Sequence, residues 1–141
     1  GNDNPVTGTD GRPQFYLLQA RFRVNADNNL AMTCRYGPDA SNLTTQVNNF
    51  GIAAGVETLQ ALYAEDRDGD GVADSWVQAG NWADEGRVLA VRVAMLLASP
   101  RVSNGTTPRP VTLLDEVFAV PADGRLRRTI SLTSAIRGRL P

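Results

Sequence analysis

The feature that most constrains the fold is a strict alternation of apolar and polar residues on either side of a short polar turn. Residues 15–24 place apolar side chains at every second position, and residues 30–36 repeat this pattern. A period of two brings alternate side chains to one face of an extended strand, which is typical of a half-buried β-strand. Residues 25–29 between the two runs are Asn, Ala and Asp, and Asn and Asp favour turns. The sequence therefore predicts a β-hairpin over residues 15–36.

Three later segments also read as extended. Residues 88–97 are almost continuously apolar and rich in Val, which predicts a central strand covered on both sides, with Arg92 needing a partner or solvent. Residues 126–136 alternate and predict a last strand, and residues 111–120 predict a weaker extended stretch. The apolar face expected for the central strand is unbroken and consists of Leu89, Val91, Val93, Met95 and Leu97.

The remaining segments are ambiguous or rich in turn residues. Residues 55–64 fit a helix face and a strand face equally well, so periodicity does not settle them. Residues 37–51 and 99–110 predict loops, and residues 1–13, without periodicity, predict a loop or frayed end. We find no internal repeat and no second domain. We therefore expect one β-rich domain over residues 1–141, mainly antiparallel.

The composition excludes most common enzyme classes. The chain contains no His and no Lys, and all 14 basic residues are Arg. Without His there is no Ser-His-Asp system and no His-ligated zinc, and without Lys there is no Schiff base and no Walker-type phosphate loop. A hydrolase that uses two carboxylates survives, but the spacing of Asp84, Glu85, Asp115 and Glu116 singles out no pair. We expect a binding or structural protein, not an enzyme.

Charge and hydropathy narrow the partners further. A net charge of −1 gives no support to a nucleic-acid partner. No apolar run approaches the roughly 18 to 20 residues of a membrane-spanning helix, and the first residues predict a fragment cut from a longer protein. Cys34, the single cysteine, has no internal disulfide partner. It is interpreted as a small buried apolar residue, with a partner outside this chain as the alternative.

The segment with the most chemistry is an acidic stretch between residues 65 and 74. Its carboxylates alternate and are followed by Gly71, in the spacing of the calcium loop D-x-D-x-D-G-x-x-D. Alternating carboxylates can surround one hard cation, and glycine permits the sharp turn. The twelfth position is Val77 instead of a bidentate Glu, so a full EF-hand is not expected. The predicted metal ligands are the side chains of Asp66, Asp68, Asp70 and Asp74 and the carbonyl of Val72.

The charge distribution supports a cation at this loop. Residues 65–74 hold five of the 15 acidic residues and one of the 14 arginines. Such crowding raises carboxylate pKa values and costs stability unless a cation compensates. Because the ligands are many, flexible and all oxygen, calcium is favoured over magnesium, with a dissociation constant on the order of 10⁻⁴ M. A solvated acidic turn is the alternative.

Two further groups of residues have competing interpretations. Trp76 and Trp82 flank the exit of the acidic loop, where core or edge packing is favoured over a stacking or sugar-binding site. Three arginines at the start of the last strand form either a solvated face, which is favoured, or a phosphate or nucleic-acid site. These arginines are Arg125, Arg127 and Arg128.

Several segments carry a family resemblance. They are residues 15–17, 55–63, 68–74, 88–97 and 123–140. In this order they resemble PilW-type minor pilins of bacterial type IV pili over roughly residues 14–141. The resemblance implies an α+β pilin-like fold, of which this chain is a mainly antiparallel β part, without the N-terminal spine helix and cleaved leader of the family. By kinship with the J-type minor pseudopilin of type II secretion, residues 56–64 become a strand.

The resemblance also implies a function. The chain would be a non-enzymatic minor pilin that contributes to the tip or priming complex and to pilus assembly. Its partners would be other minor pilins, its location the periplasm and the extracellular pilus, and its only membrane contact the absent N-terminal helix. Calcium in the Asp-rich loop would be structural. The alternatives are a calcium-dependent module that binds carbohydrate or a host surface, and a minor pseudopilin of type II secretion.

Overall fold

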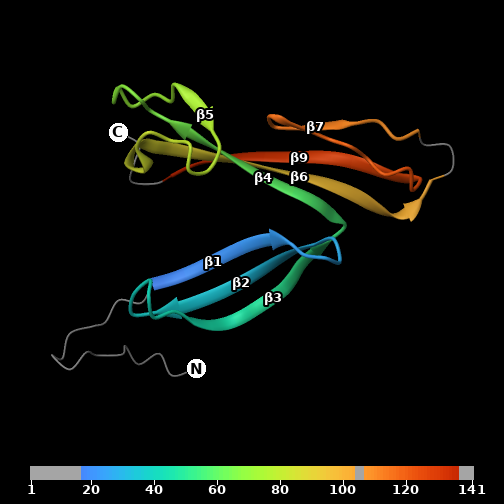
Figure 1. Cartoon of the computed structure of the whole chain (residues 1–141), viewed down its shortest axis with the longest axis horizontal. Helices are drawn as coiled ribbons and strands as arrows, with labels where there is room; N and C mark the ends of the chain where they lie inside the picture. Colours follow the sequence, from blue (N-terminus) through green and yellow to red (C-terminus); the bar gives the residue numbers. More distant parts are fainter. Residues whose placement is uncertain (1–16, 104–106, 137–141) are drawn as a thin grey trace. The chain divides into compact units, whose positions relative to one another are not determined.

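A computed structural model describes residues 17–103 and 107–136 (Figure 1). In this part of the chain the regular structure is β-strand apart from one short 3-10 helix, η1 (Glu85–Arg87). Every strand pair is antiparallel, which confirms the prediction of a mainly antiparallel β fold. The chain divides into two compact units, residues 1–54 and 55–141. The predicted loop over residues 1–13 lies outside the described residues, and the expectation of a single domain stays a prediction.

The first unit contains a three-stranded sheet of order β1–β2–β3. Its strands are β1 (Leu17–Val24), β2 (Asn29–Gly37) and β3 (Thr44–Ala54). β1 and β2 pair in unbroken register from Leu17 opposite Gly37 to Val24 opposite Leu30, which confirms the predicted hairpin. The side-chain oxygen of Asn25 accepts hydrogen bonds from the backbone N–H groups of Asp27 and Asn29 in the turn. An Asx turn of this kind fixes the register of the hairpin.

The loop predicted over residues 37–51 is wrong for its second half, because β3 begins at Thr44. β3 is an edge strand and its Thr, Gln and Asn side chains are exposed, so its sequence lacks a regular apolar alternation. Its pairing with β2 is interrupted by three register shifts. Asn49 has a positive φ of 53° within the strand. These irregularities are typical of β-bulges, which disguise a strand in the sequence.

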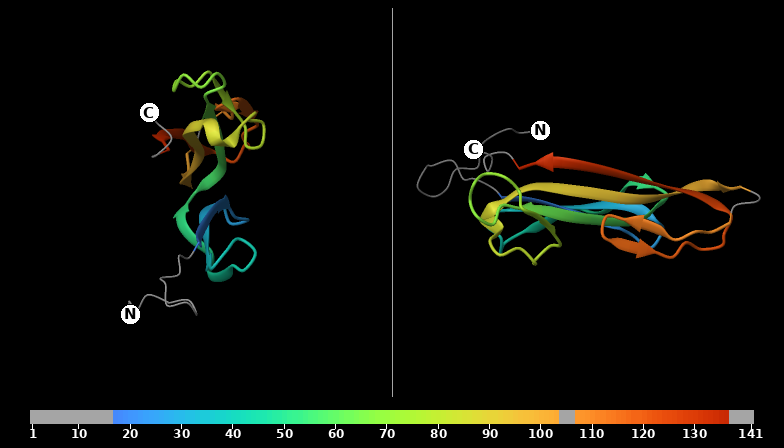
Figure 2. Two further views of the ribbon diagram at one scale, coloured as in Figure 1. Left: turned by 90° about the vertical axis from the view of Figure 1, so that its left-hand side faces the viewer. Right: turned by 90° about the horizontal axis from the view of Figure 1, so that it is seen from above.

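The second unit is built on a four-stranded sheet of order β5–β4–β6–β9. The strands are β4 (Val56–Glu65), β5 (Ser75–Val77), β6 (Val88–Val102) and β9 (Arg125–Ala135). β4, β6 and β9 run side by side in both Figure 1 and Figure 2. The ambiguous residues 55–64 are thus a strand. β6 lies centrally, as predicted, but it continues to Val102, into the segment expected to be a loop.

The two faces of β6 are buried unequally. Ala94 and Leu96 form a buried cluster with Leu113. Leu113 belongs to a small hairpin of β7 (Val111–Leu113) and β8 (Glu116–Phe118). This hairpin accounts for the extended stretch predicted over residues 111–120. On the other face Leu89 is buried, but Val91, Val93 and Met95 are only half-buried among the described residues. Among the described residues this face is therefore covered only in part, whereas the β7–β8 hairpin covers the face that carries the alanines.

An ion cluster ties the end of this sheet together. The Arg127 guanidinium on β9 makes paired hydrogen bonds of 2.7 Å to Glu57 on β4 and of 2.8 Å to Asp123 in the preceding turn. Its side chain is only 4% exposed. These acceptors hold the pKa of Arg127 above its usual value, Asp123 first and Glu57 second. The favoured interpretation of this arginine as part of a solvated face is therefore wrong.

Candidate metal centre

The acidic loop connects β4 to β5 and is closed at its base by the backbone. Glu65, the last residue of β4, pairs with Ser75, the first residue of β5. The Asp74 N–H donates to the Glu65 carbonyl at 2.9 Å. The loop between them is therefore short and both of its ends are anchored in the sheet, which restricts where its carboxylates can lie.

Glu65, buried at the end of β4, holds the base of the loop in place. Its carboxylate is 1% exposed, accepts hydrogen bonds from the backbone N–H groups of Ala83 and Asp84, and forms a 3.1 Å ion pair with Arg67. The Asp84 N–H, foremost, holds the pKa of Glu65 below its usual value against the opposing effect of burial. The Glu65 carboxylate thus has its hydrogen-bond and ion-pair partners within the protein. Glu65 therefore has a structural role, because it connects residues 83–84 to the loop.

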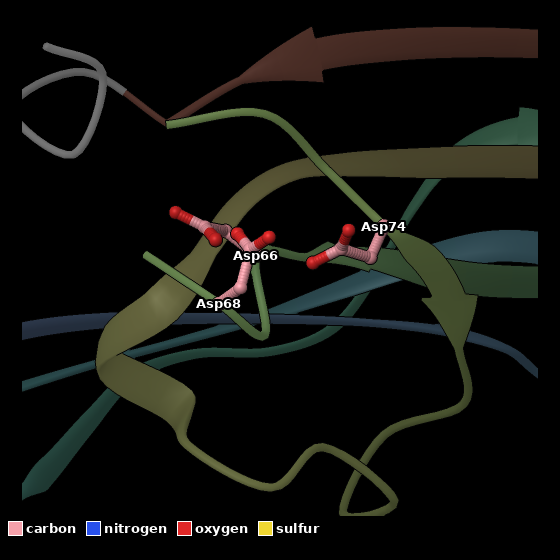
Figure 3. Close-up of side chains that lie close together, drawn as sticks. All are labelled: Asp66, Asp68 and Asp74. Atoms are coloured by element: carbon pink, nitrogen blue, oxygen red, sulfur yellow. The ribbon is translucent and has the colours of Figure 1, made fainter. Parts of the chain in front are cut away.

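Three of the predicted ligands lie together. Asp66, Asp68 and Asp74 each present one carboxylate oxygen, and these oxygens lie within 4.8 Å of one another. Figure 3 shows Asp74 pointing toward Asp66 and Asp68 from the far side of the loop. Asp66 is buried, whereas Asp68 and Asp74 are exposed. This separation is short enough for one cation to contact all three carboxylates at the 2.3–2.6 Å typical of calcium.

The local backbone explains why Asp66 points inward. Its two oxygens accept hydrogen bonds from the N–H groups of Gly69 at 2.6 Å and Gly71 at 3.0 Å. Both glycines have a positive φ, 85° and 86°, which side-chain-bearing residues rarely adopt. Burial raises the pKa of Asp66, but the hydrogen bonds from Gly71, Gly69 and Asp70 outweigh it, so the pKa lies below its usual value. Asp66 is therefore held as a carboxylate.

The remaining predicted ligands are placed differently. Asp70 is not in the group of three, and its Oδ1 accepts a 2.8 Å hydrogen bond from the N–H of Val72. The Val72 side chain is 64% exposed, and the role of its carbonyl stays a prediction. Asp74 Oδ2 accepts from the N–H of Arg67 at 2.7 Å, so the first and last parts of the loop are joined directly.

Arg87 is a neighbour of the loop that the sequence did not single out. Its Nη1 donates to the Arg67 carbonyl at 2.8 Å, and its guanidinium lies against Gly69. Its charge also contributes to the low pKa of Asp66. Arg87 lies 20 residues from the carbonyl it contacts, so no local pattern could have found it. Together with Arg67 it balances part of the negative charge of the loop.

Both tryptophans pack against the sheet, as the favoured interpretation expected. Trp82 contacts Tyr63 edge to face, with ring centroids 5.2 Å apart. The Arg92 guanidinium lies 4.0 Å from the centre of the Trp76 ring and donates a 3.0 Å hydrogen bond to Thr133. Arg92 thus has the partner that its position in an apolar strand requires. A hollow of about 180 Å³ lies beside Trp82 and Tyr63.

The described residues form a mainly antiparallel β-sheet fold of the kind found in pilin-like globular domains. No helix in these ranges is long and apolar enough to cross a membrane. The chain belongs to the PilW family, described as type IV pilus-assembly protein W, whose model matches residues 16–138. Its role is therefore in type IV pilus assembly. No curated protein and no solved structure matches the chain.

Proposed function

We propose that this chain is a non-enzymatic minor pilin that acts in the tip or priming complex of a type IV pilus through contacts with other minor pilins. The observation that carries the proposal is the family match over residues 16–138. The absence of His and Lys from the whole sequence agrees with a role without catalysis. In this role the protein works in the periplasm before assembly and on the extracellular pilus afterwards.

The second part of the proposal is that calcium stabilises the Asp-rich loop. It is supported by the close approach of Asp66, Asp68 and Asp74 and by an oxygen-only set of ligands. Asp70 and the Val72 carbonyl would complete the coordination after a small rotation of the loop. The amide hydrogen bonds to Asp66 and the charge of Arg87 compete with the ion. Affinity should therefore be modest, with a dissociation constant on the order of 10⁻⁴ M.

Thermal unfolding tests the calcium part. An ion that binds only the folded state raises the unfolding midpoint by mass action, and a concentration about 100 times the dissociation constant adds about 2.7 kcal/mol. We expect about 10 mM calcium to raise the midpoint over that in EDTA, and magnesium to act more weakly. Asp68→Ala should abolish the rise. Asp27→Ala, an exposed aspartate in the β1–β2 turn, should preserve it and serves as the matched control.

Two results would contradict the calcium site. One is an unchanged midpoint in calcium with a folded sample, and the other is an equal rise in the Asp68→Ala variant. Either would leave the loop as an acidic turn held by Glu65 and Asp66, without affecting the pilin role.

Assembly is tested separately. Deleting the encoding gene should reduce the number of surface pili seen by electron microscopy, and the wild-type gene should restore it. The purified chain should bind other minor pilins of the same organism, and added sugars should leave this binding unchanged. Unchanged piliation together with EDTA-sensitive glycan binding would favour the carbohydrate-binding alternative instead.

A further inference from the structure

β9 is a long strand at the edge of the second unit's sheet. It spans 11 residues and pairs on one side with β6. In the described part of the chain no strand pairs with its other side, and Figure 2 shows it outermost in this sheet. An unpaired edge presents a row of backbone donors and acceptors that can template another strand.

The other edge strands carry features that discourage pairing along their length, whereas the charges of β9, Arg125, Arg127 and Arg128, are confined to its first four residues. β5 is three residues long, β1 carries Arg21 and Arg23, and β3 is interrupted by three register shifts. β9 pairs with β6 without a register shift from 127 to 135, and residues 129–135 contain no charge and no proline. Short edges, charges and bulges are the usual protection against edge pairing. β9 is therefore the edge best suited to receive a strand.

The phase of the hydrogen bonds identifies the outward-facing groups. The N–H of Ile136 donates to the Leu89 carbonyl at 2.8 Å, so the backbone of this position faces β6. In an antiparallel pair the direction alternates along the strand. The even-numbered residues of β9 therefore bond to β6. The N–H and C=O groups directed to the outer edge belong to Thr129, Ser131, Thr133 and Ala135.

We propose that a second copy of this chain pairs antiparallel with β9 through its own β9, with Ile130 of each copy on the two-fold axis. This register pairs all 11 residues of the strand with their symmetry mates. It places outward-facing Thr129 opposite outward-facing Ser131, which lets both exchange hydrogen bonds. The two four-stranded sheets would join into one continuous eight-stranded sheet. The contact is isologous, because both copies use the same strand, and it is additional to the proposed contacts with other minor pilins.

In this register the side chains of β9 in one copy are complementary to those of β9 in the second copy. Ile130 is 46% and Leu132 72% exposed, and both lie on one face. Ile130 would pack against its own symmetry mate, and Leu132 would lie opposite Arg128, whose aliphatic stem can cover it. Arg125 and Arg127 would fall opposite Ala135 and Thr133. No two like charges lie opposite each other, so the charge pattern permits the dimer instead of opposing it.

The mass of the whole chain in solution tests the proposal. Light scattering on a size-exclusion column should give 15.2 kDa when the protein is dilute and twice that value as its concentration approaches about 1 mM. Ile130→Lys places two charges opposite each other and should raise the dimer dissociation constant at least about tenfold. Val117→Lys is the matched control, because Val117 is 70% exposed on β8. Ser131→Pro should also prevent pairing while sparing the bonds to β6.

Cross-linking tests the register independently of folding. In a Cys34→Ser background, Ile130→Cys puts two thiols opposite each other at a Cα separation of about 4.5 Å, within reach of a disulfide. Leu132→Cys leaves its two thiols about four residues, or roughly 13 Å, apart along the strand and should not cross-link. A monomer at about 1 mM, a dimer unaffected by Ile130→Lys, or cross-linking through residue 132 would overturn the proposal.

Discussion

The two units of the chain use the same strand pairing but differ in what covers their sheets. Ten apolar residues are buried in the described part of the chain, and nine of them belong to the second unit. The exception is Ala31 on β2. In the first unit Leu18, Phe22 and Phe50 are 68%, 51% and 59% exposed. The first sheet is therefore amphipathic without a second layer among the described residues.

The difference shows that strand formation and burial are separate outcomes. Alternation sets the face on which apolar residues lie, and backbone pairing sets the register. Burial requires another element, and in the second unit this is the β7–β8 hairpin, which places Leu113 against Ala94 and Leu96. The Arg127 cluster adds a second tie between β4 and β9. The second unit should therefore respond more strongly to side-chain truncation.

The largest expected effect contrasts two leucines. Leu113→Ala removes a side chain that is 2% exposed and should lower the free energy of unfolding by about 2–5 kcal/mol, through lost burial and a cavity. Leu18→Ala makes the same chemical change at a site that is 68% exposed and should cost less than about 0.5 kcal/mol. Urea unfolding of both variants measures the contrast. Equal costs would break the comparison, because they would mean that the first sheet is covered in solution.

The next effect concerns the ion cluster. Arg127→Met removes the guanidinium from beside Glu57 and Asp123 and leaves Glu57, which is 18% exposed, without its cation. Removing one partner of a buried pair typically costs about 3 kcal/mol or more. Arg101→Met, an exposed arginine near the end of β6, is the control and should change stability by less than about 0.5 kcal/mol. If both variants unfold at the same urea concentration, the cluster is not a stabilising tie.

Secondary-structure elements could be predicted where neighbouring residues in the sequence carry the pattern. The hairpin followed from its alternation and turn, and β6 from its apolar run. β3 was missed because bulges and exposed polar residues erase the alternation. The unequal burial of β6 could not be predicted, since it depends on Leu113, which lies 17 residues or more away in the sequence from the residues it covers.

In the candidate site, too, local features could be predicted from the sequence and long-range contacts could not. The spacing of Asp66, Asp68 and Asp74 predicted their proximity, because a short loop brings alternate residues together. The buried role of Glu65 was missed, although an acid that ends a strand is a detectable signal. The contacts of Arg87 with the loop and of Glu57 with Arg127 span 20 and 70 residues, so only the fold reveals them.

A smaller effect sharpens the account of the first unit. With little burial, its sheet depends on the turn, where the Asn25 side chain accepts two backbone hydrogen bonds of 3.0 Å. Asn25→Ala should cost about 1 kcal/mol, since it leaves both donors without this acceptor. Hydrogen exchange of the β1 and β2 amides should then be roughly fivefold faster, while β6 amides are unchanged. Equal acceleration in β6 would show that the two units unfold together.

The smallest expected effect is the acid dependence of the second unit. The pKa of Asp123 lies well below its ordinary value of 3.8, because the Arg127 guanidinium, foremost, and the Arg125 N–H donate to its carboxylate. A depressed pKa contributes stability that is complete above the ordinary value and is lost as the pH falls through the folded-state pKa. Asp123→Asn should therefore unfold at a lower urea concentration at pH 7, with the gap to wild type narrowing below about pH 4. Asp27→Asn, in the first unit, controls for the loss of one charge. A gap that stays constant down to pH 2 would mean that the ionisation of Asp123 contributes nothing to the cluster, and that Glu57 alone holds Arg127.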